Sequence, residues 1–250
     1  MRAMVLAAGL GTRMGALTRD VPKPLLDVGG VTLIGRQLER LAAAGVTGAV
    51  VNVSRHGDAI RRALGDGGRW HMTLEYSDEG PEPLETGGGI LRALPRLGRE
   101  PFLLVNADVL TDFDYAALAL DGAEGVLVLV PNPEHNPRGD FAVDGRGILR
   151  GDGPRLTYGG IALLDPALFR GFEPGRRPLK PILDAALARG TLRGVRHDGL
   201  WIDVGTPERL EEARAFVRGE RGTAATRAGA AGDGQGPDAT RAGRRRPMPR

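Results

Sequence analysis

A glycine-rich turn follows the first apolar run of the sequence. Residues 6–14 read LAAGLGTRM, which places Ala8, Gly9, Gly11 and Thr12 directly before Arg13. Small residues allow backbone N–H groups to approach an anion closely, and the arginine can neutralise its charge. The chain has no Gly-Lys-Ser/Thr of a P-loop, and the third glycine of a dinucleotide-binding motif is replaced by methionine. The turn suits a polyphosphate, and it suits a tight structural connection equally well.

A lysine between two prolines follows ten residues after the arginine, in the stretch Pro22-Lys23-Pro24. The prolines fix the backbone on both sides and so aim the ammonium group at low entropic cost. Such a lysine is ordinarily a solvated loop residue. Only two of the 34 basic residues are lysines, however, and a compact ammonium can act where a planar guanidinium cannot. We therefore interpret Lys23 as a phosphate ligand and assign no role to the other lysine, Lys180.

Two aspartates follow apolar runs that read as strands. Asp108 comes after residues 102–105, and Asp203 comes after Trp201-Ile202. Because the carboxyl ends of parallel strands meet in one crevice, distant acids at such positions can converge. Two carboxylates together with triphosphate oxygens suit Mg²⁺. Each acid alone could serve a turn or a helix cap; with the glycine-rich turn and Lys23 in the same chain, we predict a Mg²⁺ site.

The elements that must position these residues alternate between strand and helix. Strand patterns cover residues 4–8, 49–53, 72–76, 102–105 and 126–130. Helical spacing of apolar residues joins them at 34–45, at 59–64 and in a helix that we expect Thr86 to cap. This rhythm predicts a Rossmann-like, doubly wound and mostly parallel α/β sheet.

The second half of the chain has shorter elements between Gly- and Pro-rich turns. Strands are expected at 141–143, 148–150, 158–164, 192–195 and 201–204, and a helix at 181–188. Thr206 precedes Pro207, the pattern of a helix N-terminus, with Leu210, Ala213 and Val217 as the buried stripe. We expect one compact domain over residues 1–218, with a nucleotide-binding first half and an acceptor-binding second half.

Composition excludes several classes of protein. The chain has no cysteine, which excludes disulfides, thiolate metal sites and cysteine nucleophiles. No apolar run approaches about 18 residues, so we expect no membrane span. The N-terminus enters a hydrophobic strand directly, which predicts a cytoplasmic protein without a secretory signal.

The formal net charge of +3 comes from the end of the chain. Residues 219–250 hold seven arginines and three acids, whereas residues 1–218 have a net charge of −1. The same end has no Val, Ile, Leu, Phe, Tyr or Trp, so we predict a disordered tail. Its three consecutive arginines, 244–246, could contact nucleic acid or acidic lipid, but a solvated tail is the ordinary explanation. We therefore expect neither a nucleic acid nor a membrane as partner, and the oligomeric state cannot be read.

The chain resembles the sugar-1-phosphate nucleotidyltransferases over about residues 1–217. The resemblance is carried, in order and spacing, by residues 6–14, 22–24, 85–89, 106–108 and 201–206. Residues 83–90, 102–106 and 138–141, with the short length, make it most similar to the uridylyltransferases of peptidoglycan recycling. That similarity implies transfer of a uridylyl group from UTP to N-acetylmuramate 1-phosphate. Alternatives are another sugar 1-phosphate, mannose or glucose 1-phosphate, and a catalytically silent regulatory subunit.

The resemblance also implies roles for particular residues. The backbone of the glycine-rich turn and Arg13 hold the triphosphate, and Lys23 bridges phosphates near the reacting centre. The base is read at Glu85, Gly87 and Gly88, where glycines leave backbone groups free. Asn106 and the turn at Gly139-Asp140 hold the sugar, and Asp108 and Asp203 bind Mg²⁺. The four histidines, scattered along the chain, receive no catalytic role.

Overall fold

Four parallel strands form the first half of the central sheet. The computed structural model describes residues 1–219. In it, β1 (Arg2–Leu6) pairs with β4 (Gly48–Val53) on one side and with β6 (Phe102–Asn106) on the other, and β5 (Thr73–Asp78) pairs with β4 at the edge. All three pairings are parallel, so the carboxyl ends of these strands lie together.

The second half extends the sheet with both orientations. The long strand β11 (Arg155–Leu164) runs antiparallel to β6 and to β8 (Gly125–Val130). β12 (Leu192–Arg196) runs parallel to β8, and β9 (Phe141–Val143) and β10 (Leu149–Arg150) extend the end of β11. The result is a mixed, mostly parallel α/β sheet.

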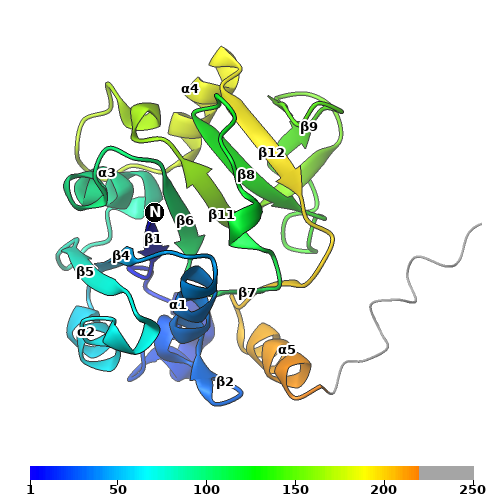
Figure 1. The fold of residues 1–250 in the computed structure, drawn as a ribbon. Coiled ribbons are helices and arrows are strands. Elements are labelled where there is room, and N and C mark those ends of the chain that lie inside the picture. The colour runs from blue at the N-terminus through cyan, green and yellow to red at the C-terminus, as the bar shows by residue number, and fades with distance from the viewer. Residues whose placement is uncertain (220–250) are drawn as a thin grey trace, which may run out of the picture.

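Helices cover both faces of the sheet, as Figure 1 shows. α1 (Leu33–Ala43) and α2 (Gly57–Leu64) pack on one face, and α3 (Glu85–Leu97) and α4 (Lys180–Arg189) pack on the other. Side chains of β1 alternate between the two cores: Val5 enters the first and Met4 the second. This two-sided burial explains the continuously apolar strands and confirms the predicted doubly wound class.

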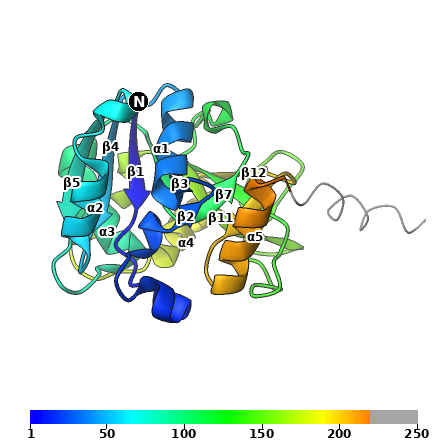
Figure 2. The same cartoon turned by 90° about the horizontal axis from the view of Figure 1, so that it is seen from below.

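A third, smaller core joins a segment early in the chain to β13 and α5. It contains the hairpin of β2 (Asp27–Val28) and β3 (Val31–Thr32), the ladder of β7 (Val109–Thr111) and β13 (Trp201–Asp203), and α5 (Pro207–Val217). In Figure 2, β1 points toward the segment that follows it, and α5 lies beside that segment. Short 3₁₀ turns complete the fold: Thr12–Thr18, Lys23–Leu25, Gly68–Trp70, Tyr115–Ala117 and Pro166–Phe169.

Most expected elements are present, with a few differences. Thr206 caps α5 as predicted, because its Oγ1 accepts a hydrogen bond from the Arg209 backbone N–H at 3.4 Å. Thr86 does not cap α3: the helix begins at Glu85, so Thr86 lies inside its first turn. The sequence patterns did not indicate β7 or the β2–β3 hairpin. The predicted disordered tail falls, except for Gly219, outside the described residues.

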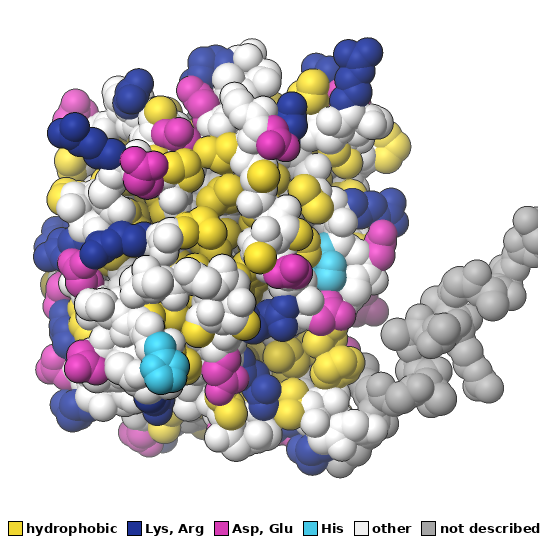
Figure 3. Space-filling view, in the orientation of Figure 1, with side chains coloured by type: hydrophobic (Ala, Val, Ile, Leu, Met, Phe, Trp, Pro, Cys, Tyr) yellow, Lys and Arg dark blue, Asp and Glu magenta, His cyan; other side chains and the backbone are white. Residues whose placement is uncertain are grey.

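Hydrophobic side chains gather on the face of the molecule on which the N-terminus lies. Figure 3 shows them near the middle of this face, in the orientation of Figure 1. Within residues 1–219, no helix has both the length and the apolar character needed to cross a bilayer.

Candidate active site

A cavity of about 620 Å³, called here the turn cavity, lies at the carboxyl ends of β1 and β6. The predicted phosphate turn, the lysine between prolines and one of the two aspartates all reach it. Its lining includes Gly9, Gly11, Thr12, Arg13, Lys23, Glu85 and Asp108. Residues distant in sequence thus converge on one hollow, as the strand-end argument predicts.

The turn after β1 is held in place by hydrogen bonds at Gly11 and has free space for a ligand at Gly9. Gly11 has a φ of +63°, a conformation that favours glycine, and its carbonyl accepts from Thr18 Oγ1 and from the Met14 N–H, both at 3.0 Å. Met14 is buried in the third core and fixes the turn. A Cβ added at Gly9 would meet nothing within 4 Å, so ligand atoms have room there.

Arg13 is the cation that the turn presents to the cavities. Its guanidinium passes close to Gly205, where an added Cβ would lie 3.4 Å from Nη2. Among residues 1–219, no carboxylate lies within ion-pair distance of this guanidinium. An unpaired guanidinium beside exposed backbone N–H groups is suited to binding phosphate oxygens.

Lys23 and Asp108 form an ion pair between Nζ and Oδ2. Pro24 is buried and fixes the start of the lysine's 3₁₀ turn, and Asp108 lies in the connection from β6 to β7. The side chain of Lys23 is only 10% exposed and that of Asp108 25% exposed. The predicted phosphate ligand and the predicted metal ligand therefore contact each other.

The two aspartates are brought together by a short antiparallel ladder. Asp203 is the last residue of β13 and faces Val109 of β7, and the Val204 N–H donates to the Asp108 carbonyl at 2.9 Å. The sequence predicted that the two aspartates lie close together at the ends of parallel strands. That reason is wrong for Asp203, because β13 pairs with β7 outside the parallel sheet. Both acids line a second cavity of about 470 Å³, the aspartate cavity.

Asp203 has an arginine and a histidine as neighbours. Its Oδ2 lies 3.3 Å from Arg209 Nη1 and 3.6 Å from His135 Nε2. His135, which sequence reasoning left without a role, thus lines the aspartate cavity. Burial, followed by the Arg209 charge, lowers the pKa of His135, which favours the neutral imidazole.

The donor set around the two aspartates fits a hard divalent cation that also binds substrate. Within the described residues, no group of three or more His, Cys, Asp or Glu side chains could hold a metal. Asp108 and Asp203 therefore form no complete metal site by themselves, although both line the aspartate cavity, and substrate or water oxygens would add ligands. Mg²⁺ is commonly bound by one or two carboxylates plus substrate phosphates.

The predicted base-reading segment forms the first turn of α3. Glu85 has a φ of +61° and pairs with Arg176 Nε at 3.0 Å. The expectation of free backbone groups is corrected for Gly88, because its N–H donates to the Arg177 carbonyl at 2.9 Å. A Cβ at Gly88 would lie 2.2 Å from the Gly175 carbonyl oxygen, and one at Gly87 2.7 Å from that of Pro178. These two glycines permit close packing and do not line the turn cavity.

The predicted sugar ligands line a third cavity of about 560 Å³, the tyrosine cavity. Asn106 and Asp140 contribute to its wall together with Tyr158. Asp140 Oδ2 accepts from the Tyr158 N–H at 2.8 Å and from Asn136 Nδ2 at 3.1 Å. Gly139 is not part of the wall; its φ of +60° shapes the turn that presents Asp140.

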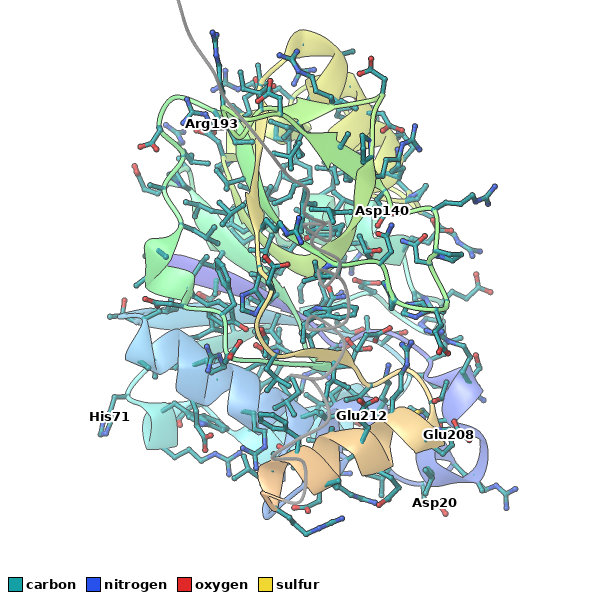
Figure 4. All side chains as sticks on the ribbon, turned by 90° about the vertical axis from the view of Figure 1, so that its right-hand side faces the viewer. Asp20, His71, Asp140, Arg193, Glu208 and Glu212 are labelled. Atoms are coloured by element: carbon teal, nitrogen blue, oxygen red, sulfur yellow. The ribbon has the colours of Figure 1, made fainter. Side chains whose placement is uncertain are left out.

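A side view places the sugar-side aspartate relative to the rest of the molecule. In Figure 4, Asp140 lies on the same side as Glu208 at the start of α5 and Asp20 of the turn segment. His71 lies on the opposite side of this view.

Two buried polar residues support the turn and were not predicted. Asn52 Oδ1 accepts from the Ala7 N–H at 2.7 Å, and Asn52 Nδ2 donates to Glu79 Oε1 at 2.7 Å. Both side chains line a small cavity of about 200 Å³ that also includes Ala8. The sequence could have indicated a role for Asn52, because this asparagine interrupts the apolar run of residues 49–53.

Comparison with known proteins agrees with this geometry. Residues 2–138 match the family described as "Nucleotidyl transferase". The chain is 46% identical over 228 residues to the N-acetylmuramate alpha-1-phosphate uridylyltransferase of Neisseria meningitidis serogroup B, covering 87% of this chain and 98% of that one. It is 36% identical to the protein of the same name from Caulobacter vibrioides, covering 85% and 95%.

A solved structure supports the same fold. HddC from Yersinia pseudotuberculosis superimposes with a TM-score of 0.72 at 24% identity, covering 86% of this chain and 99% of that one. Sequence match, relatives and fold agree: the chain belongs to the nucleotidyl transferase family.

Proposed function

We propose that the chain transfers a uridylyl group from UTP to N-acetylmuramate 1-phosphate and releases pyrophosphate. The observation that carries the proposal is the convergence of Arg13, Lys23, Asp108 and Asp203 on adjoining cavities. The choice of substrates is supported by the Neisseria relative, which is similar along 98% of its own length and is named for this reaction. UTP is a cytoplasmic metabolite, so we infer a cytoplasmic enzyme.

The turn cavity is the proposed triphosphate site. Backbone N–H groups from Ala8 to Thr12 and the unpaired guanidinium of Arg13 bind the phosphate oxygens. Glu85 and the first turn of α3, which includes Gly87 and Gly88, form the base side of the site. Glu85 lines the turn cavity and Gly87 and Gly88 do not, so the glycines act through packing.

The tyrosine cavity is the proposed acceptor site. Asn106 and Asp140 offer an amide and a carboxylate to sugar hydroxyls, and Gly139 presents Asp140. This cavity shares Asn106, Asp140 and Tyr158 with the aspartate cavity, so an acceptor bound there can direct its phosphate toward Asp108.

Asp108 and Asp203 would hold Mg²⁺, which neutralises phosphate charge and orients the reacting groups when bound. An oxygen of the acceptor phosphate attacks the α-phosphorus of UTP, forming a new P–O bond. The bond from that phosphorus to the bridging oxygen breaks, and its electron pair leaves with pyrophosphate. The nucleophile is already anionic, so no general base is needed; Arg13 and Lys23 stabilise the developing negative charge.

A pyrophosphate-release screen of four nucleoside triphosphates against several sugar 1-phosphates tests this function. We expect the highest kcat/KM for UTP with N-acetylmuramate 1-phosphate. A preference for GTP with mannose 1-phosphate, or for glucose 1-phosphate, would assign the chain to a different member of the family. Absence of pyrophosphate release with every pair would indicate a silent homologue.

A further inference from the structure

The second lysine of this lysine-poor chain lies at the acceptor cavity. Lys180 is the first residue of α4 and lines the tyrosine cavity together with Tyr158, Asp140 and Phe141. Its Nζ lies 5.0 Å from the centroid of the Phe141 ring. The cavity therefore has an ammonium group on a wall that is otherwise partly apolar, with Leu179 and Leu183 beside it.

An independent observation points to a ligand in the same cavity. The hydroxyl of Tyr158 is buried and has no hydrogen-bond partner among the described residues. Burying an unpaired hydroxyl is costly, and such groups in native structures commonly mark a place where a ligand or water binds. Asp140 adds an acceptor, because both hydrogen bonds that it receives use Oδ2.

Lys180 lines a different cavity from the residues that are proposed to bind the reacting phosphates. The turn cavity and the aspartate cavity contain Arg13 and Asp108, and Lys180 lines neither of them. Lys23 lines the turn cavity and not the tyrosine cavity. The two lysines thus line different cavities, which favours a second anionic group of the acceptor as the partner of Lys180.

We propose that Lys180 binds a carboxylate carried by the acceptor sugar in addition to its 1-phosphate, and so selects a sugar acid over a neutral hexose. This inference rests on the proposed function, because N-acetylmuramate has such a carboxylate on the lactyl ether at C3. The buried Tyr158 hydroxyl donates to an oxygen of the same substituted sugar. The methyl groups of the acceptor contact the wall formed by Phe141, Leu179 and Leu183.

Lys180 already has one carboxylate partner. Its Nζ contacts Asp184 Oδ1 one turn later on α4, and both side chains are about half exposed. Asp184 does not line the tyrosine cavity. An ammonium has three donors, so the acceptor carboxylate can join Asp184, which keeps Nζ beside the cavity.

Two acceptors that differ only in the lactyl ether test the proposal. These are N-acetylmuramate 1-phosphate and N-acetylglucosamine 1-phosphate, each assayed with UTP on the wild type and on Lys180→Met. Loss of a charge-assisted hydrogen bond should lower kcat/KM for the first acceptor by about 10- to 100-fold. The value for the second acceptor should change by less than about twofold. Lys180→Arg should retain part of the preference, because the positive charge stays.

Asp184→Asn is the matched control, since it breaks the same ion pair without removing the ammonium. We expect it to keep the preference for the sugar acid. Where turnover of N-acetylglucosamine 1-phosphate is too slow, its inhibition constant against the first acceptor replaces kcat/KM. Equal losses for both acceptors in Lys180→Met, or no loss, would overturn the role of Lys180. A wild type that is inactive with N-acetylmuramate 1-phosphate instead rejects the proposed function.

Discussion

The Nζ of Lys23 contacts Oδ2 of Asp108 across 85 residues of sequence, inside the cavity that the glycine-rich turn also lines. Each charged group thus has a protein partner within this cavity. Under the proposed function, Lys23 would also contact the triphosphate and Asp108 would hold Mg²⁺. Nucleotide and metal binding are then linked through one ion pair.

Lys23→Ala should lower kcat by about 10²- to 10³-fold, the effect of removing one preorganised electrostatic donor. The ammonium gains more interaction with the transition state than with the ground state, so the loss falls on kcat. Lys23→Arg should rescue poorly, because a planar guanidinium cannot take the position of a compact ammonium at a largely buried site. Steady-state kinetics distinguish a catalytic role from a binding role. A raised KM with unchanged kcat would show that Lys23 only binds substrate.

Asp108→Asn and Asp203→Asn should each abolish most turnover while the fold stays intact. Each substitution removes one of the two aspartates of the aspartate cavity that are proposed to hold the metal. Pyrophosphate release measured against Mg²⁺ concentration should show a higher Mg²⁺ requirement in both variants. Circular dichroism checks the fold, and full wild-type activity in EDTA would contradict the two-aspartate site.

Gly88→Ala should destabilise the protein, because its Cβ would lie 2.2 Å from the Gly175 carbonyl oxygen. Overpacking of this kind costs about 1–3 kcal/mol, or roughly 2–10 °C in Tm for a domain of this size. Gly145→Ala is the control, because nothing lies within 4 Å of a Cβ there. Thermal unfolding of both variants provides the measurement, and similar Tm values would show that the α3 contact can relax.

The parallel strands were predictable because two-sided burial makes them continuously apolar. β1 sends Val5 and Met4 to opposite cores, so neither face of the strand could be polar. Their carboxyl ends also fix where the phosphate turn and Asp108 must lie. The turn, Lys23 and Asp108 therefore follow from local pattern and general topology.

The remaining parts of the site depend on contacts that local pattern does not encode. β7 has three residues and becomes a strand only by pairing with β13, almost a hundred positions later. His135 reaches Asp203 from a loop, and its neighbours in sequence give no sign of that contact. The close packing of Gly88 against the Arg177 segment likewise appears only when both are in place.

Asn52→Leu should lower the free energy of unfolding by about 2–5 kcal/mol. The substitution leaves the Ala7 N–H and the carboxylate of Glu79 without this partner, and the wild-type side chains are only 4% and 7% exposed at Asn52 and Glu79. Urea unfolding gives the free energies. In a double-mutant cycle with Glu79→Leu, the combined loss should be smaller than the sum of the single losses, since the double variant removes both members of the pair.

Because Ala7 starts the phosphate turn, KM for UTP should rise more than KM for the acceptor. Additive losses, or equal changes in both KM values, would show that the network does not support the turn.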